Sequence, residues 1–339
     1  MKQRASRFTV ALLCISLVLL ALGLCIGSTG FENLWLQLTA ADDAHRATAW
    51  QIVWDIRLPR TVGAWAAGAL LGLAGALSQG LFRNPLADPY LLGSASGAAL
   101  GVAIALAFGG WWAKFGVTGF AFAGAVLAVL FTLSLARGVQ HTMRLLLAGV
   151  IVGVVLGAVT SLVLLWSPDS LQAMQAFMLG STSLVDWQAS VLMLTVWLLC
   201  VSVAWALSRA LDGLSLGEAT AASLGLPLVP LRAVLVTVLA LATGAAVAHT
   251  GLIAFVGLAA PHVVRGLARV THGQLMWLAS LTGGVLLSAA DLLARGLIAP
   301  LELPVGVLTA VLGGGYLLWL MYRRSAWAGS PQQALRGVE

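Results

Sequence analysis

Apolar stretches of about 20 residues recur along this 339-residue chain, with short polar segments between them. A stretch of about that length lets an α-helix cross the hydrocarbon core of a bilayer. Hydrophobic residues make up 60% of the chain and charged residues only 9%, which is more apolar surface than a soluble domain can hide. The pattern predicts an all-α integral membrane protein, with residues 1–339 forming a single polytopic transmembrane domain.

We expect ten spans, and an even number places both termini on the same side of the membrane. The stretch 252–267 is short and contains Pro261, which favours a broken or tilted helix. The predicted spans are 8–28, 61–81, 91–108, 116–136, 145–166, 187–207, 230–248, 252–267, 276–297 and 305–321. Glycines four residues apart within them are typical of closely packed membrane helices; they are Gly68 and Gly72, Gly97 and Gly101, and Gly149, Gly153 and Gly157.

Basic residues indicate the orientation, because cytoplasmic loops carry an excess of Lys and Arg. With the N-terminus inside, thirteen of the eighteen basic residues are cytoplasmic: Lys2, Arg4, Arg7, Arg83, Arg137, Arg144, Arg209, Arg232, Arg265, Arg269, Arg323, Arg324 and Arg336. Arg46, Arg57, Arg60, Lys114 and Arg295 remain outside. Both termini are therefore expected in the cytoplasm. The bases are scattered over separate loops, which argues against nucleic acid as a partner. A signal peptide is the alternative for the first span, although it lacks a clear cleavage site.

A polytopic membrane protein of this kind can be a transporter, and the sequence limits which energy source could drive the transport. Its two lysines, Lys2 and Lys114, do not end a G-x-x-x-x-G-K-[ST] phosphate loop, so the chain is not a P-loop ATPase. A proton-coupled carrier needs ionisable groups inside the membrane, yet only Asp291 of the twelve carboxylates lies well within an apolar span. Arg295 follows one helical turn later, and we interpret the two as a structural ion pair.

Residues 208–230 form the longest informative cytoplasmic segment. Ser215-Leu-Gly-Glu218 matches a capping box, which predicts that a short helix begins there. Gly225 and Pro227 are expected to end it. Small residues flank Leu224, which would let this apolar side chain enter a groove on another protein. A solvated loop is the alternative.

Several motifs together resemble the FecCD permeases, the membrane subunits of importers for ferric siderophores, haem and cobalamin. They cover positions 57 to 315 in the family's order. The matching runs are Arg57-Leu-Pro-Arg60, Asn84-Pro-Leu-Ala-Asp-Pro-Tyr-Leu-Leu-Gly93, Leu216-Gly-Glu-Ala219 with Leu224-Gly225, Phe255-Val-Gly-Leu258 with Pro261-His262 and Arg265, Ala290-Asp291 with Arg295, and Leu303-Pro-Val-Gly306.

The resemblance implies the type II permease architecture of ATP-binding cassette (ABC) importers, in the bacterial inner membrane. It implies a homodimer, two ATPase subunits in the cytoplasm and a periplasmic substrate-binding protein. The chain itself would bind no cofactor or metal and catalyse no reaction, because ATP and Mg²⁺ belong to the ATPase. Residues 208–230 would be the coupling loop. The implied site residues are Glu218, Ala219, Ala222, Leu224 and Gly225 for ATPase coupling, Arg57, Arg60 and Arg295 for binding-protein docking, and Gln172, Met174, Gln175, Phe177 and Met178 along the translocation path.

Two other functions are alternatives for this sequence. Gly213-Leu-Ser-Leu-Gly217 matches the G-x-S-x-G nucleophile elbow of hydrolases, but a membrane span precedes it and no histidine lies nearby in the sequence. A secondary carrier or channel is the remaining alternative, which the scarcity of intramembrane charge disfavours. Among the family's cargoes, we rank iron chelates ahead of cobalamin because they are the more common within the family.

Overall fold

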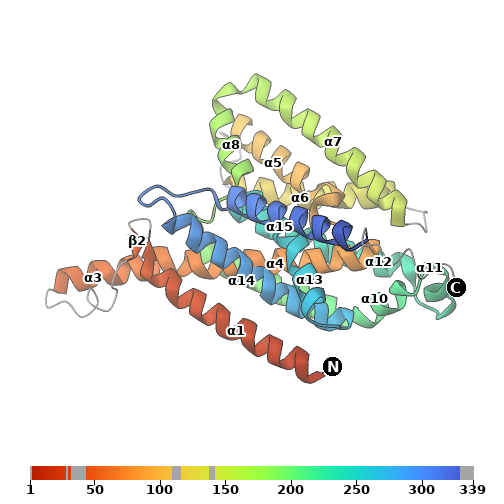
Figure 1. The fold of residues 1–339 in the computed structure, drawn as a ribbon. Coiled ribbons are helices and arrows are strands. Elements are labelled where there is room, and N and C mark those ends of the chain that lie inside the picture. Colours follow the sequence, from red (N-terminus) through yellow and green to blue (C-terminus); the bar gives the residue numbers. More distant parts are fainter. Residues whose placement is uncertain (1, 28–29, 32–42, 109–115, 137–141, 329–339) are drawn as a thin grey trace.

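The computed structural model describes residues 2–27, 30–31, 43–108, 116–136 and 142–328, and within them the chain is nearly all helical (Figure 1). Its longer helices are α1 (Lys2–Cys25), α3 (Asp43–Gln51), α4 (Leu58–Phe82), α5 (Ser94–Phe108), α6 (Gly116–Leu135), α7 (Thr142–Trp166), α8 (Leu171–Leu179), α9 (Trp187–Ala206), α10 (Ser208–Ser215), α11 (Glu218–Ser223), α12 (Leu228–Thr250), α13 (Val256–Leu267), α14 (His272–Gly296) and α15 (Val305–Ala328). The short elements are a π-helical turn, η1 (Ile52–Arg57), two 3-10 turns, η2 (Pro89–Leu92) and η3 (Pro168–Ser170), and two strands, β1 (Ile26–Gly27) and β2 (Gly30–Phe31).

Every predicted span corresponds to one of these helices. In the described part of the chain, α1, α6, α7, α9, α12, α14 and the continuous helix Asp43–Phe82 contain apolar stretches long enough to cross a membrane. α5 and the Val305–Trp319 part of α15 are shorter apolar helices. α13 has 12 residues and contains Pro261. The expectation of about ten helices, with a short eighth one, therefore agrees with the structure.

Two helices begin later than predicted, each for a local reason. The third span starts as a helix only at Ser94, because η2 comes first and is capped by Asp88, whose carboxylate accepts the Tyr90 N–H at 2.8 Å. The eighth starts at Val256, because α12 continues to Thr250 and Gly251, with a φ of 67°, caps its end. Glycine adopts such a left-handed conformation without the steric cost that other residues bear.

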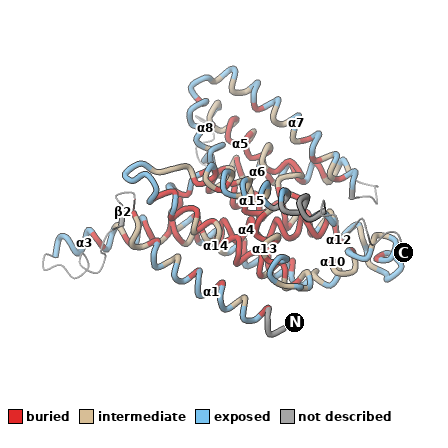
Figure 2. Tube along the Cα trace, in the orientation of Figure 1, coloured by how far each residue is buried: buried red, intermediate tan, exposed pale blue. Residues whose placement is uncertain are grey.

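Helices α4 and α14 form the buried centre of the bundle (Figure 2). Their backbones touch at glycines. A Cβ placed on Gly72 would lie 2.2 Å from the carbonyl oxygen of Ala279, and one on Gly283 would lie 2.2 Å from that of Gly68. Close backbone approach is how membrane helices gain packing energy in lipid. The predicted pair Gly68 and Gly72 therefore lies at a close helix contact. By contrast, no described atom lies within 4 Å of the Cβ position of Gly157.

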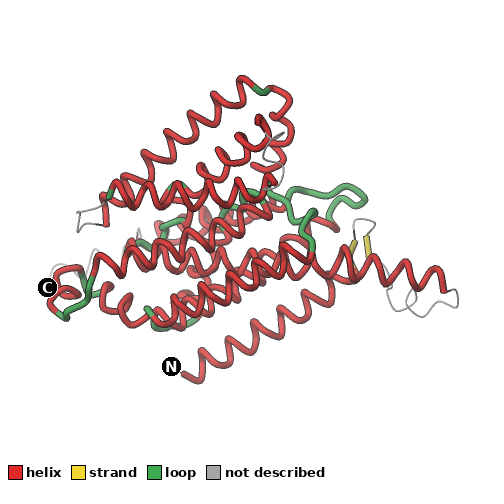
Figure 3. The backbone as a smooth tube through the Cα atoms, turned by 180° about the vertical axis from the view of Figure 1, so that it is seen from behind, coloured by secondary structure: helices red, strands yellow, loops and turns green. Residues whose placement is uncertain are grey.

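The remaining long helices surround this centre. α1 packs on α14 on one side, while α5, α6 and α7 lie together on another (Figures 1 and 3). Only 17% of the apolar stretch of α1, and the same share of α7, is buried within the chain. Apolar side chains that remain exposed along a whole span suit contact with lipid or with another membrane subunit.

The two ends of the bundle differ in character. One end carries the start of α1 together with α10 and α11, and the other carries α3, β2 and α8 (Figures 1 and 3). We refer to them as the α10/α11 end and the α3/α8 end. No strand pattern was expected from the sequence, yet β1 and β2 form a two-residue antiparallel ladder at the α3/α8 end. Lys114, Arg137 and Arg336, three of the basic residues that indicate the orientation, lie outside the described residues.

Candidate functional site

The segment between α9 and α12 folds as two short helices at the α10/α11 end. Leu211 and Leu214 bury one side of α10, and Ala221 buries one side of α11. Gly217 joins the two helices with a φ of 110°, and Gly225 ends α11 with a φ of 78°. The Gly225 N–H donates to the Ala222 carbonyl. The segment is therefore anchored to the bundle, as a docking element requires.

The predicted capping box does not form. The Ser215 hydroxyl donates to the Asp212 carbonyl at 2.6 Å, and Ser215 ends α10 instead of capping α11. The residue that precedes α11 is Gly217, without a side-chain cap. Helix α10 ends at the position where the cap was expected, so the serine hydroxyl bonds within α10 and not to α11. The prediction of a short helix near Glu218 is nevertheless confirmed.

Glu218 ties α11 to the bundle. Its carboxylate accepts from Arg232 at 2.7 Å, and Arg83 lies 3.8 Å away. The side chains of Glu218 and Arg232 are only 18% and 10% exposed. Since Arg83 follows α4 and Arg232 belongs to the first turns of α12, one carboxylate connects three helices. In this structure Glu218 is thus bound within the chain, and its two arginine partners could not be inferred from the sequence.

The other predicted coupling residues form the outer surface of this segment. Ala219, Ala222, Leu224 and Gly225 are all exposed. Leu224 is 63% exposed, and Leu216, which the sequence did not single out, is 65% exposed. The two exposed leucines flank α11 and, with the exposed Ala219 and Ala222 between them in the sequence, make the outer surface of this segment largely apolar. Such a surface favours contact with another protein.

A buried charge cluster lies at the α3/α8 end. Asp291 accepts from Arg60 (Nη2 to Oδ1, 3.1 Å) and also forms an ion pair with Arg295. Arg60 donates to Glu302 at 2.9 Å, and the Thr182 hydroxyl donates to Asp291. Asp291 and Arg295 are each 1% exposed. The two positive and two negative charges balance, which such burial demands. The predicted Asp291–Arg295 ion pair is confirmed.

The three arginines expected to dock a binding protein are all buried. Arg57 donates to the Leu24 carbonyl at 2.8 Å, and Arg60 and Arg295 belong to the charge cluster. Each is at most 9% exposed. They lie near one another at the α3/α8 end. Their charges, however, are directed into the chain, and the sequence did not show that Glu302 and Thr182 join them.

The segment expected to line the translocation path is α8. Gln172, Gln175 and Met178 are exposed, and Phe177 is half-buried. Met174 is 5% exposed and packs with α5, α6 and α12 in a second apolar cluster. Gln172, Gln175 and Met178 therefore belong to the exposed part of α8, together with Leu171, Ala173, Ala176 and Leu179, while Met174 packs against the bundle.

The end of α8 lies against two other backbones. The Leu252 N–H donates to the Phe177 carbonyl at 3.1 Å, and the Gly306 N–H donates to that of Gly180 at 3.3 Å. A Cβ on Gly306 would lie 2.4 Å from the carbonyl oxygen of Leu179. α8 is thus joined to the turn after α12 and to the first turn of α15. The Leu303-Pro-Val-Gly306 motif supplies this contact, and the sequence alone did not connect it with α8.

Comparison with known proteins gives a consistent result over nearly the whole chain. The model of the FecCD transport family matches residues 12–323. The vitamin B12 import system permease protein BtuC of Salmonella paratyphi A is 37% identical over 329 residues, which cover 95% of this chain and 97% of that protein. BtuC of Salmonella typhi is also 37% identical, over 333 residues, with the same coverage.

A solved structure is similar as well. It is described as an inward-facing conformation of a metal-chelate type ABC transporter, and it superposes with a TM-score of 0.80 at 29% sequence identity. The match covers 94% of this chain and 99% of the other. The helical arrangement described above is therefore that of an ABC permease.

Proposed function

Because this chain belongs to the FecCD transport family and has the fold of an ABC importer permease, we propose that it moves a cobalamin or an iron chelate into the cytoplasm, driven by a separate ATPase. The chain is a multi-pass membrane protein and a transport subunit. Cobalamin now stands first among the cargoes, since the relatives named above import vitamin B12. The earlier ranking of iron chelates rested on how common they are in the family.

The observation that carries the proposal is the α10–α11 segment. It is anchored by buried leucines and by the Glu218–Arg232 ion pair, yet it exposes Leu216 and Leu224. An apolar surface that is firmly anchored to one end of a membrane bundle suits a partner that transmits conformational changes to the bundle. That partner would be the ATPase subunit, which would bind ATP and Mg²⁺, with this chain supplying residues 208–230 as the coupling loop.

The expected orientation also places the other partners, which are the binding protein and a second copy of the chain. With both termini in the cytoplasm of a bacterial inner-membrane protein, the α10/α11 end faces the ATPase and the α3/α8 end faces the periplasmic binding protein. A second copy of the chain would complete the path, with the exposed face of α8 lining it. Arg57, Arg60 and Arg295 stay the predicted docking residues. A partner carboxylate would have to compete with Asp291 and Glu302 for Arg60.

The first experiment is co-purification of the chain with its ATPase. We expect Leu216→Asp plus Leu224→Asp to lose the ATPase, because two charges replace the apolar contact. The matched control is Leu301→Asp, since Leu301 is similarly exposed, at 70%, but lies in the α14–α15 connection at the opposite end. If the native chain and both variants all fail to retain an ATPase, a secondary carrier becomes the leading function.

The cargo needs its own measurement. Cells that express the chain with its partners should accumulate cyanocobalamin more than a ferric siderophore, and the uptake should stop in the Leu216→Asp/Leu224→Asp variant. Preferential uptake of the siderophore would support the importer function but show that the cargo is an iron chelate. Uptake that continues without ATP would contradict the ATP-driven mechanism itself.

A further inference from the structure

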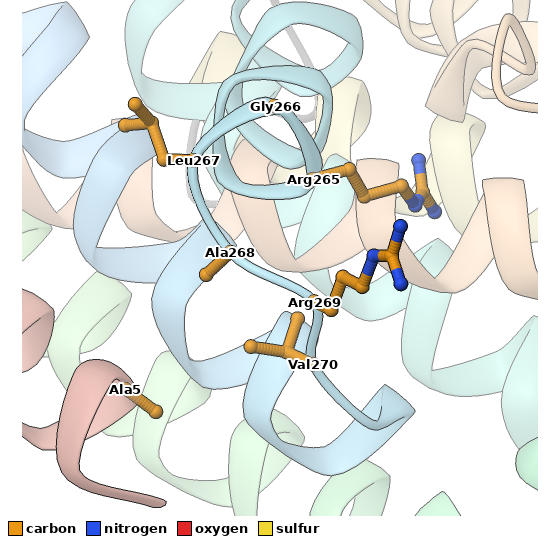
Figure 4. A pocket seen from close by; sticks show the side chains of 7 residues that line it. All are labelled: Ala5, Arg265, Gly266, Leu267, Ala268, Arg269 and Val270. Atoms are coloured by element: carbon orange, nitrogen blue, oxygen red, sulfur yellow. The ribbon is translucent and has the colours of Figure 1, made fainter. Parts of the chain in front are cut away.

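A basic pocket lies at the α10/α11 end, beside the connection from α13 to α14. We define it by Arg265, Arg269, His272 and Ala5. One hollow of about 510 Å³ lies between Ala5 of α1 and the two arginines, and a second of about 330 Å³ adjoins it and reaches His272. Figure 4 shows the Arg265 and Arg269 side chains extending to the same side of the connection. The predicted path residues of α8 are not among them, and the coupling loop reaches the pocket only through Asp212, which His272 contacts.

The charges of this pocket are not balanced. Within the described residues, no carboxylate lies within ion-pair distance of Arg265 or Arg269, and Arg265 donates only to the Gln79 side chain. The nearby carboxylate of Asp212 accepts from the His272 N–H and from Nδ1, at 3.0 and 2.7 Å. Two like charges lining one hollow repel each other unless an anion lies between them. Gln79, itself 2% exposed, fixes Arg265 in place.

The depth of the pocket in the membrane identifies the kind of anion. Ala5 is the first residue of the apolar span Ala5–Cys25, and His272 is the first residue of the span His272–Gly296. The pocket therefore lies where two spans leave the hydrocarbon, at the level of the lipid headgroups. Leu267 is 64% exposed beside it and points away from the arginines (Figure 4). An apolar side chain next to two cations suits a molecule with acyl chains and a phosphate.

We propose that the basic pocket binds the phosphate headgroup of an anionic phospholipid, held by Arg265 and Arg269 between α1 and the α13–α14 connection. Basic pockets between membrane helices are suited to anionic lipid headgroups, and each arginine near the surface contributes about 1 kcal/mol. The lipid would link α1, which is otherwise mostly exposed, to the buried centre of the bundle through Arg265 and Gln79. This inference does not depend on the cargo or the ATPase.

The test is native mass spectrometry of the full-length chain in detergent, with added phosphatidylglycerol or phosphatidylcholine of the same acyl chains. We expect the native chain to retain phosphatidylglycerol preferentially. Arg269→Gln should weaken retention about fivefold, and Arg265→Gln plus Arg269→Gln about 25-fold. Arg209→Gln is the matched control, because Arg209 is exposed on α10 at the same end but does not line the pocket.

Four results would overturn the proposal. The first is equal retention of phosphatidylcholine, and the second is undiminished retention of phosphatidylglycerol in both arginine variants. The third is loss of the ATPase, but not of the lipid, from the Arg269→Gln variant, which would assign the pocket to a protein partner. Displacement of the lipid by an equal concentration of inorganic phosphate would also contradict it, because the site would then recognise a soluble anion. Arg269→Gln alone keeps the test informative if the double variant does not fold.

Discussion

Arg232 donates to the Glu218 carboxylate at 2.7 Å, so the first residue of α11 is bound to the first turns of α12. Arg83, which follows α4, approaches the same carboxylate. The residue that the sequence assigned to contact with a partner is therefore a link inside the chain. A movement of α11 must be felt by α4 and α12, since they share this charge.

Glu218→Gln should loosen this link. A hydrogen bond to a charged group stabilises a fold by about 1.5–3 kcal/mol, and Arg232 would keep a largely buried charge. We expect a lower unfolding temperature of the purified chain and weaker retention of the ATPase. Asp55→Asn removes a carboxylate at the α3/α8 end and serves as the control. A Glu218→Gln variant with native unfolding temperature and native ATPase retention would show that the ion pair is dispensable.

Asp291→Asn should be among the most destabilising single changes in the chain. It leaves the charges of Arg60 and Arg295 buried without their shared carboxylate, and breaking such a group costs about 3–5 kcal/mol. Thermal unfolding in detergent measures the loss. Combining Asp291→Asn with Arg295→Met should cost less than the two single changes added together, because each removes the other's unpaired charge. Strict additivity would mean that the two groups do not interact.

Gly72→Ala should separate α4 from α14. The new Cβ would lie 2.2 Å from the Ala279 carbonyl oxygen, inside any allowed contact. Overpacking of this kind costs about 1–3 kcal/mol, which the unfolding temperature would report. Gly157→Ala is the matched change on α7, where no described atom lies within 4 Å of the new Cβ. If both variants unfold at the same temperature, the glycine contact is not what holds the two helices together.

Gly306→Ala should disturb the end of α8, which is expected to line the translocation path, more than the fold. Its Cβ would press on the Leu179 carbonyl at the end of α8, while Gly315→Ala on the same helix meets no described atom within 4 Å. We expect Gly306→Ala to lower substrate uptake in cells while the ATPase still co-purifies. Gly315→Ala should leave both unchanged. Native uptake by Gly306→Ala would argue that the contact between α8 and α15 does not control passage.

Much of the fold was accessible from the sequence, because hydrophobic length alone specifies a membrane span. The same reasoning found the short span around Pro261 and the pairing of Asp291 with Arg295, since residues four apart lie on one helix face. It also placed a short helix near Glu218. These features depend on spacing along the chain, which the sequence displays directly.

Contacts between distant segments were not accessible in this way. The partners of Glu218, and the approach of Thr182 and Glu302 to Asp291 and Arg60, depend on how helices far apart in the sequence come together. The capping-box prediction was wrong for a related reason, because the Ser215 hydroxyl donates to the Asp212 carbonyl within α10. A local motif is reliable only when no neighbouring element competes for the same group.

The helix from Asp43 to Phe82 runs for 40 residues without a break. At 1.5 Å per residue that is about 60 Å, roughly twice the thickness of the hydrocarbon core. Its inner part, α4, belongs to the most buried of the long apolar helices in the described residues, and α3 projects beyond the other helices at the opposite end from α10 and α11 (Figure 1). A molecule that touches α3 therefore contacts an extension of the central helix itself, joined to it through the π-helical turn η1 and not through a loop.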